Sequence, residues 1–123
     1  MSNDPQTTSG ILLFAHGSPD PEWAKPFREI LARVQLSAPE RVATLSFLEG
    51  SPNLDDGVTV LVEAGVTQIT LVPLFLARGG HLKRDLPLLL DAASVKHGVS
   101  FSQLPAIGES EDMLAAISAW VIG

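Results

Sequence analysis

Cysteine is absent from the 123-residue chain. Disulfide bonds, thiolate metal sites and cysteine nucleophiles are therefore excluded, and a metal ion has to be bound by imidazole, carboxylate or carbonyl groups. Basic residues are scarce, because 8 lysines and arginines face 14 acidic residues and give a formal net charge of −6 at pH 7. Nucleic acids and anionic membranes bind clusters of lysine and arginine, so the sequence predicts neither kind of partner.

Long hydrophobic runs are missing as well. No apolar stretch approaches the roughly 18 residues that a membrane-spanning helix needs. The first nine residues are mostly polar and lack the basic-then-apolar layout of a signal peptide. We therefore expect a disordered tail over residues 1–9 and a single domain over residues 10–123, in a soluble cytoplasmic protein.

Short apolar runs alternate with amphipathic segments along the rest of the chain. The runs are bounded by glycine, proline and polar residues, as buried strands are, whereas the amphipathic segments repeat apolar residues at helical spacing. Pro87 is expected in or near the first turn of its helix, where proline is tolerated. The predicted elements are strands at residues 10–16, around 42–47, at 68–75 and at 99–104, and helices after Asp20, at 54–64 with Ser51 or Asn53 as cap, from about 81–85 to 96, and at 110–122.

This βαβαβαβα order predicts an α/β fold with a four-stranded, mostly parallel sheet, because parallel strands need crossovers and right-handed crossovers place helices on both faces. The commonest small arrangement is flavodoxin-like, with strand order 2-1-3-4. In that order the carboxyl ends of the first three strands lie side by side. Ligands of open α/β sheets bind at this edge.

Two histidines and a glutamate follow these three strands. His16 ends the first predicted strand, Glu49 lies just past the second, and His81 follows the third after a Gly-Gly pair. Neighbouring strands are about 4.8 Å apart, so the three side chains are expected in one crevice. Two imidazoles and a carboxylate suit a borderline divalent metal such as Fe, Co, Ni or Zn, and imidazoles also exchange protons near neutral pH.

Each histidine also has a structural interpretation. A single histidine after a strand is more often a turn or capping residue than a ligand, and the matched placement of His16 and His81 is what favours function. His97 precedes Gly98 at a predicted helix C-terminus, where the helix dipole favours a cation and glycine ends the helix. We therefore predict that His97 is structural.

Three segments of the chain carry a family resemblance: His16-Gly17-Ser18, Phe47-Leu48-Glu49, and the stretch from Pro73 to Pro87 that contains Gly79-Gly80-His81. They resemble the short CbiX-type sirohydrochlorin chelatases, a group of class II tetrapyrrole chelatases, and the resemblance covers essentially the whole chain from Gly10. It implies ATP-independent insertion of Co²⁺ or Fe²⁺, with Ni²⁺ as a further option, into sirohydrochlorin on the route to cobalamin or sirohaem. The metal is then a substrate, and no cofactor is permanently bound.

The resemblance also implies roles for particular residues. His16 and His81 match the catalytic and metal-binding pair of the family, and Glu49 matches a glutamate that assists in several members. Either histidine can serve as ligand or as base, and Glu49 as a third ligand or as the group that fixes an imidazole tautomer. Short members resemble one half of a two-domain chelatase and generally pair, so we expect a homodimer.

An acidic chain needs local positive or hydrogen-bonding groups to bind a substrate with many carboxylates. Such groups surround His81, although an ordinary solvated position is the competing interpretation for each single cation. The predicted substrate-binding residues are Ser18, Arg78, Gly79, Gly80, Lys83 and Arg84.

The larger apolar side chains on the predicted helices are expected to pack rather than to bind substrate. Trp23 is predicted to pack against the sheet or a second subunit. The residues predicted to be core or subunit contacts are Val58, Leu61, Ile117 and Trp120.

Two other functions stay open at this point. The same fold and histidines suit a carrier that binds a metal or tetrapyrrole without turnover. The second is a phosphohydrolase that uses His16, but Ala15 stands where histidine phosphatases place arginine, and no glycine-rich phosphate loop follows the first strand.

Overall fold

The computed structural model describes residues 9–123. The predicted tail lies outside the described residues except for Ser9, which begins the first strand. Within residues 9–123 no helix is both long and apolar enough to cross a membrane. In chain order the elements are β1 (Ser9–Ala15), the 3₁₀ helix η2 (Pro21–Ala24), α1 (Lys25–Ser37), β2 (Val42–Phe47), α2 (Leu54–Glu63), β3 (Gln68–Pro73), α3 (Gly80–His97), β4 (Ser100–Gln103), the 3₁₀ helix η3 (Ile107–Glu109) and α4 (Glu111–Ile122).

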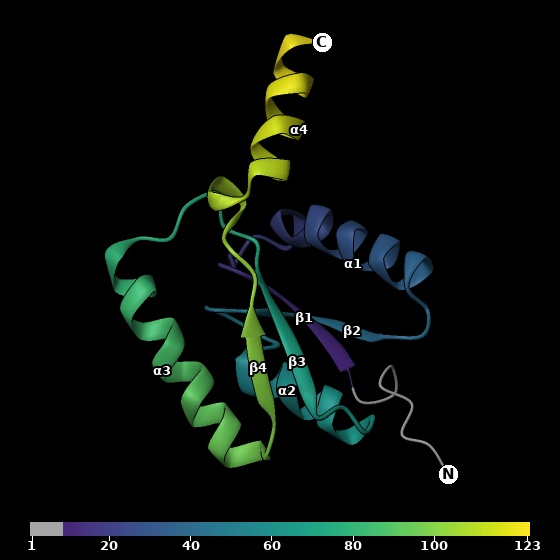
Figure 1. The fold of residues 1–123 in the computed structure, drawn as a ribbon, viewed down its shortest axis with the longest axis vertical. Helices are drawn as coiled ribbons and strands as arrows, with labels where there is room; N and C mark the ends of the chain where they lie inside the picture. Colours follow the sequence, from purple (N-terminus) through teal and green to yellow (C-terminus); the bar gives the residue numbers. More distant parts are fainter. Residues whose placement is uncertain (1–8) are drawn as a thin grey trace.

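The four strands form one parallel sheet in the order β2-β1-β3-β4, which confirms the predicted fold class and topology (Figure 1). β1 is central, with Gly10 opposite Val42 on one side and Ile69 on the other. The apolar run that follows Gly10 is buried throughout, because helices or their loops cover both faces of this strand. The first three strands therefore end side by side, as the site prediction requires.

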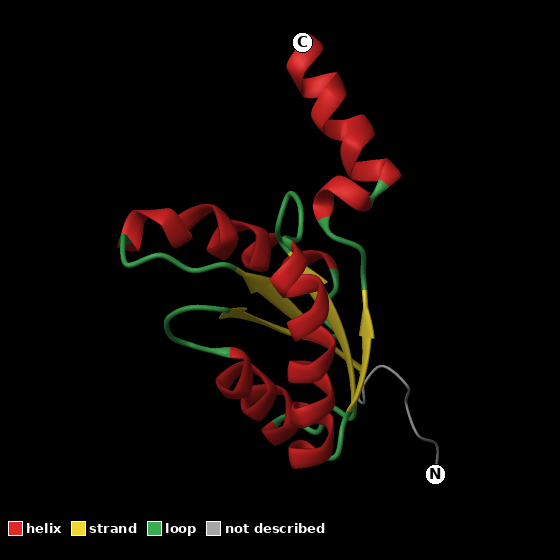
Figure 2. Ribbon diagram, turned by 90° about the vertical axis from the view of Figure 1, so that its left-hand side faces the viewer, coloured by secondary structure: helices red, strands yellow, loops and turns green. Residues whose placement is uncertain are grey.

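Helices cover the two faces of the sheet unequally. α2 and α3 pack on one face through a core that includes Leu12 and Leu86, and α1 packs on the other through a smaller cluster that includes Leu13 and Phe27. Figure 2 shows α1 above the strands and α2 below them. α4 points away from the body of the molecule in Figure 1, and none of its residues is buried.

The packing predictions are confirmed for Val58, Leu61 and Trp23, whereas Ile117 on α4 is only half-buried and its role as a subunit contact stays a prediction. Val58 and Leu61 are fully buried. The Trp23 ring lies 4.6 Å from that of Phe27, within the cluster between α1 and the sheet. Trp120 is 80% exposed, so its prediction as a core residue is wrong, and its role as a subunit contact stays a prediction.

Local residues set most helix ends as predicted. The side chain of Asn53 accepts a hydrogen bond from the N–H of Asp56, whose carboxylate accepts one from the N–H of Asn53, so α2 begins with a capping box. Gly98 ends α3 in the left-handed conformation, at φ +69°. Asp20 caps η2 rather than α1, which begins four residues later with Pro26 in its first turn.

The prediction for Pro87 is wrong. α3 already begins at Gly80, so Pro87 lies inside the helix rather than in its first turn. Proline cannot donate to the carbonyl of Lys83, and its ring crowds that carbonyl, so one helical hydrogen bond is lost. Both residues are exposed, which leaves this irregularity on the solvent side of α3.

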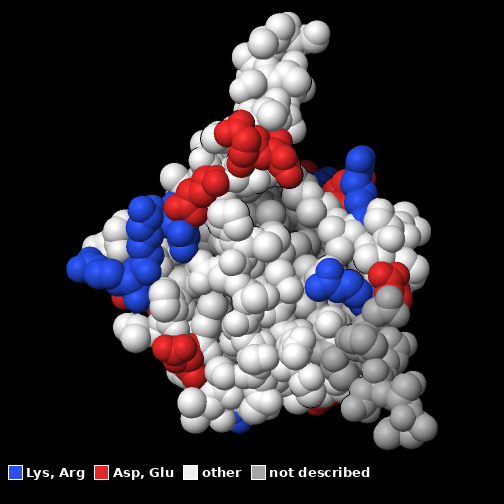
Figure 3. Space-filling view, viewed as in Figure 1, with Lys and Arg blue, Asp and Glu red and all other residues white. Residues whose placement is uncertain are grey.

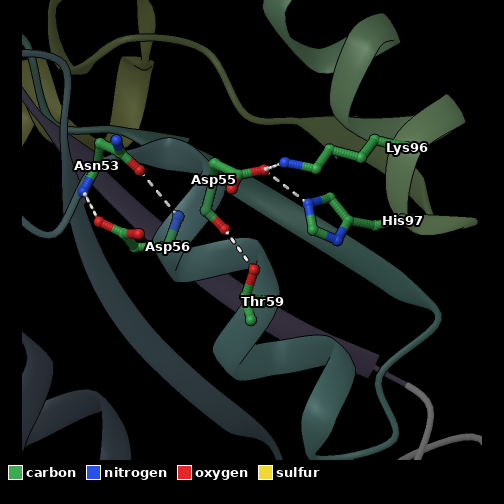
Figure 4. A network of polar contacts seen from close by, with 6 residues as sticks. All are labelled: Asn53, Asp55, Asp56, Thr59, Lys96 and His97. Atoms are coloured by element: carbon green, nitrogen blue, oxygen red, sulfur yellow. Dashed lines mark hydrogen bonds and ion pairs between the residues drawn. The ribbon is translucent and has the colours of Figure 1, made fainter.

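His97 is structural, as predicted, but through a contact that the sequence did not reveal. Its Nε2 lies 2.8 Å from Oδ1 of Asp55 on α2, and Nζ of Lys96 lies 3.0 Å from the same oxygen (Figure 4). Thr59 donates a hydrogen bond from its hydroxyl to the carbonyl of Asp55. The network ties the end of α3 to the start of α2.

Candidate functional site

A pocket of about 580 Å³ opens where β1 and β3 end and α3 begins. His16 and His81 both line it, so the structure brings the two predicted histidines to one pocket. Its other lining residues are Leu48, Phe75, Ala77, Gly79, Gly80, Leu82, Asp85, Leu88 and Leu89.

The sequence predicted His16 as the last residue of the first strand. β1 ends at Ala15, so His16 is instead the first residue after it. The ladder between β1 and β2 continues past the strands, because the N–H of Leu48 donates to the carbonyl of Ala15 and that of Glu49 to the carbonyl of His16, both at 2.9 Å. This pairing puts the Glu49 side chain beside the imidazole, with Oε2 3.3 Å from Nδ1 of His16. The imidazole edge also meets the Phe75 ring, at a centroid distance of 6.3 Å.

Gly17 makes this close approach possible. Its φ is +98°, which disfavours any residue with a side chain, and an added Cβ would lie 1.9 Å from the carbonyl oxygen of Glu49. The His16-Gly17-Ser18 segment therefore needs glycine at its centre to let the loop after β2 come alongside.

The carboxylate of Glu49 determines which nitrogen of the His16 imidazole carries the proton. A carboxylate only accepts hydrogen bonds, so Nδ1 of the neutral ring carries the proton and Nε2 keeps its lone pair. The side chain of His16 is 57% exposed, which leaves this lone pair accessible from solvent. His16 is thus able to bind a metal ion or accept a proton through Nε2, with Glu49 fixing the tautomer.

His81 lies in the first turn of α3 and is exposed. Nη2 of Arg84, one helical turn later, lies 3.5 Å from Nδ1 of His81. Gly79 precedes α3 and offers no side-chain cap, and the first backbone N–H groups of a helix have no partner within it. His81 therefore stands beside a cation and beside free N–H donors.

Glu49 does not join the two histidines in the pocket. Together with Ser18 it lines a separate hollow of about 280 Å³ over the loops that follow β1 and β2. Across residues 9–123 no group of three or more histidine or acidic side chains is close enough to bind one metal ion. The expected three-residue ligand set is therefore not assembled within this single chain, although the pair His16–Glu49 is.

The predicted basic residues fall into two kinds. Arg78 is committed to an ion pair, with Nη2 2.9 Å from Oε1 and 3.1 Å from Oε2 of Glu109, and its side chain is 19% exposed. The N–H of Ala106 and the Arg78 guanidinium hold the pKa of Glu109 below its ordinary value. Lys83 and Arg84 are exposed, and Figure 3 shows basic side chains gathered over the start of α3.

Gly79 and Gly80 line the pocket, but neither has the positive φ that would require glycine. A Cβ added at either position would meet no atom within 4 Å. The chain's own packing therefore does not demand glycine there, and the backbone at the start of α3 is accessible to a ligand.

The apolar walls of the pocket were missed at the sequence level. Leu88 is 66% exposed and Leu89 40% exposed, and they face solvent beside the buried Leu86 and Leu90. Their signal was present: four leucines within residues 86–90 are more than one buried helix face requires. Apolar side chains left at the surface beside two imidazoles suit a flat apolar ligand.

Comparison with known proteins agrees with this geometry. A model of the CbiX family matches residues 10–121, which is nearly all of the described chain. The chain belongs to the CbiX family.

Three relatives give the scale of the similarity. Sirohydrochlorin cobaltochelatase from Saccharolobus islandicus (strain L.S.2.15 / Lassen #1) is 38% identical over 85 residues, which cover 66% of this chain and 62% of that protein. A solved CbiX protein from Marinobacter aquaeolei VT8, whose name links it to cobalamin (vitamin B12) biosynthesis, has a TM-score of 0.80 at 35% identity, covering 92% of this chain and 93% of the other. The sirohydrochlorin chelatase SirB from Bacillus subtilis subspecies spizizenii, solved in complex with cobalt, has a TM-score of 0.77 at 27% identity, covering 91% of this chain and 49% of SirB.

Two of these relatives extend well beyond the part that the chain matches. Its match spans less than two thirds of the cobaltochelatase from Saccharolobus islandicus and about half of SirB. One copy of this chain therefore corresponds to one half of SirB.

Proposed function

We propose that this protein inserts a divalent metal ion, Co²⁺ or Fe²⁺, into sirohydrochlorin in the cytoplasm, without ATP. The observation that carries the proposal is the open, partly apolar pocket that His16 and His81 line together. The sirohydrochlorin cobaltochelatase and the cobalt-bound SirB among its relatives support both the tetrapyrrole and the metal.

The chemistry of metal insertion matches what His16 offers. Two pyrrole N–H protons have to leave the macrocycle while the metal ion exchanges water for ring nitrogens, so the site needs bases and a weak, exchangeable ligand set. Imidazole fills both roles near neutral pH. We assign metal delivery and proton acceptance to Nε2 of His16, with Glu49 holding the ring in the required tautomer.

His81 faces the same pocket from the start of α3, where we assign it to the second position around the metal or the leaving protons. Nη2 of Arg84 lies 3.5 Å from Nδ1 of His81, so this cation is a neighbour of the imidazole and takes no part in the assignment.

We assign the apolar walls of the pocket and the polar groups at its rim to different parts of the macrocycle. The apolar side chains of Phe75, Leu88 and Leu89 suit the flat ring. Its carboxylates are assigned to Lys83 and Arg84, to the backbone N–H groups at Gly79 and Gly80, and to Ser18 on the neighbouring loop. Arg78 is left out of this set because Glu109 already pairs with its guanidinium.

We also propose that the working unit is a homodimer. One chain matches 49% of SirB, so two copies supply what SirB carries in one chain. The incomplete ligand set agrees with this, since no third metal-binding group joins the histidines within residues 9–123 of one chain.

A metallation assay tests the proposal. Metal-free sirohydrochlorin is mixed with Co²⁺, Fe²⁺ or Ni²⁺ in parallel, with and without the protein, and the change in the absorbance spectrum is followed. We expect Co²⁺ or Fe²⁺ to be inserted faster than in the protein-free reaction. If no metal is inserted faster and the metallated product stays tightly bound, the protein is a carrier and the proposal is wrong.

A further inference from the structure

Among residues 9–123, Asp85 is the only acidic residue that lines the pocket of His16 and His81. It lies on α3 and is exposed. Within this described part of the chain its carboxylate has no ion pair and no hydrogen bond. The pocket therefore contains an unpaired carboxylate in addition to its two imidazoles.

The helix brings Asp85 to the same side as His81. The two residues are four positions apart on α3, which places their Cβ atoms about 5–6 Å apart on one face of the helix. Both line the pocket, so this face is turned to it. Two ligand side chains at this spacing bind one metal ion in the helices of many metalloproteases. α3 thus offers an imidazole and a carboxylate to a single ion.

Glu49 does not supply a carboxylate to this pocket. Its Oε2 lies 3.3 Å from Nδ1 of His16, and its side chain lines a separate hollow. Neutral imidazoles donate lone pairs but no charge, so a divalent cation that enters between apolar walls needs a negative group nearby. Asp85 provides that charge until the macrocycle, after losing two protons, provides its own.

Asp85 and the two histidines do not form one three-ligand site. No group of three or more histidine or acidic side chains within residues 9–123 is placed to hold one ion. His81 and Asp85 are exposed on α3, whereas His16 follows β1 on the sheet. An ion bound by two protein ligands keeps the rest of its coordination positions for water and stays exchangeable. This suits a position that the ion occupies before insertion.

Basic neighbours limit how tightly such an ion is bound. Lys83 and Arg84 lie between His81 and Asp85 in the sequence, and Nη2 of Arg84 is 3.5 Å from Nδ1 of His81. Both cations are exposed, so solvent and salt screen their repulsion of a metal ion only in part. The carboxylate of Asp85 offsets some of this repulsion, and we expect weak, reversible binding.

We infer that His81 and Asp85 form an entry site, which binds the hydrated divalent ion and passes it to the macrocycle beside His16. The inference deepens the proposed function and rests on it for the second step. The first step is binding of the ion alone, which is measured without sirohydrochlorin. The entry site and the proposed function can therefore fail separately.

Calorimetric titration with Co²⁺ alone tests the entry site. Asp85→Asn keeps the size of the side chain and removes its charge, so the Kd for Co²⁺ is expected to rise about 10-fold or more. Asp91→Asn is the matched control, because Asp91 is an exposed aspartate of α3 that does not line the pocket. Equal Kd values for Asp85→Asn and wild type overturn the inference, as does a wild type that binds no Co²⁺ at millimolar concentration.

Double variants show whether the two residues share one ion. Asp85→Asn should have no further effect on the Kd for Co²⁺ once His81→Ala has removed the other ligand. In His16→Ala its effect should persist, because His16 belongs to the later position. An undiminished effect in His81→Ala means that Asp85 attracts cations by charge alone, and a lost effect in His16→Ala means that all three residues bind one ion together. Either result overturns the entry site.

The metallation assay then tests the transfer. Asp85→Asn should raise the KM for Co²⁺ and leave both kcat and the KM for sirohydrochlorin near the wild-type values. A lower kcat with an unchanged KM for Co²⁺ overturns the inference, because Asp85 would then act on protons rather than on the ion. If wild type does not accelerate insertion but the Co²⁺ titrations give the expected results, the binding site stands and the proposed function alone fails.

Discussion

Two imidazole–carboxylate pairs occur within residues 9–123, and they differ in their surroundings. Nδ1 of His16 lies 3.3 Å from Glu49, and Nε2 of His97 lies 2.8 Å from Asp55. The side chain of His16 is 57% exposed, whereas that of His97 is 12% exposed. The first pair leaves an imidazole nitrogen open beside a pocket, while the second uses its imidazole to join two helices.

The difference shows that the pairing alone does not identify a reactive histidine. Asp55 is shared by His97 and Lys96, whose hydrogen bonds lower the pKa of this carboxyl below its ordinary value, His97 having the larger effect. Glu49 serves a single imidazole at the carboxyl end of the sheet. Position in the fold and access to the second ring nitrogen decide the role.

The largest expected effect is that of His16→Ala. The variant loses a base and an exchangeable ligand, so kcat/KM for metal insertion is expected to fall on the order of 100-fold or more. Its thermal unfolding should stay close to that of wild type, because the side chain is mostly exposed. A variant that keeps its activity, or one that unfolds, would place His16 with His97 among the structural histidines.

Glu49→Gln is expected to have a smaller effect on the same reaction. The amide oxygen still accepts a hydrogen bond from Nδ1 of His16, but the negative charge is lost, so the rate should fall about 10-fold. Glu49→Ala, which removes the acceptor as well, should fall further. Equal rates for wild type and both variants in the metallation assay would mean that the carboxylate does not position the imidazole.

His97→Ala should affect stability and leave the chemistry unchanged. The substitution removes one polar link between α3 and α2, so the melting temperature measured by circular dichroism is expected to fall by roughly 3–6 °C. The rate of metal insertion per folded chain should match wild type. A His97→Ala protein with wild-type melting and reduced activity would reverse the two roles.

The smallest effect is on pH dependence. The folded state lowers the pKa of Asp55 from 3.8, so its interactions stabilise the protein above that value and are lost as the pH falls through the lowered pKa. Asp55→Asn should therefore be less stable than wild type in urea unfolding at pH 6, and the difference should shrink progressively below pH 3.8. A difference that stays constant down to the acid limit would mean that ionisation of Asp55 is not its source.

Much of the fold was predictable because it follows local rules. Alternating apolar runs and helical periodicity gave the element order, and the crossover rules gave the strand order. The helix caps at Asn53 and Gly98 were also readable from the sequence. Pro87 was misplaced because α3 begins at a glycine with no side-chain cap, so no residue type marks its start.

Only those site residues whose positions follow from the ends of the strands could be predicted from the sequence. His16 and His81 share a pocket because their strands are neighbours. The side-chain direction of Glu49 depends on the loop after β2, and the pairing of Arg78 with Glu109 joins residues 31 positions apart, so neither follows from local pattern. The outward direction of α4 depends on the same long-range contacts.

The most direct measurement compares the two imidazole–carboxylate pairs in one reaction. Initial rates of Co²⁺ insertion into sirohydrochlorin are recorded for wild type, His16→Ala and His97→Ala at equal concentrations of folded chain, with a protein-free reaction as reference. We predict that wild type and His97→Ala react alike and that His16→Ala approaches the protein-free rate. Equal rates for His16→Ala and wild type, or a wild-type rate no faster than the reference, would contradict the assignment of catalysis to the open pair.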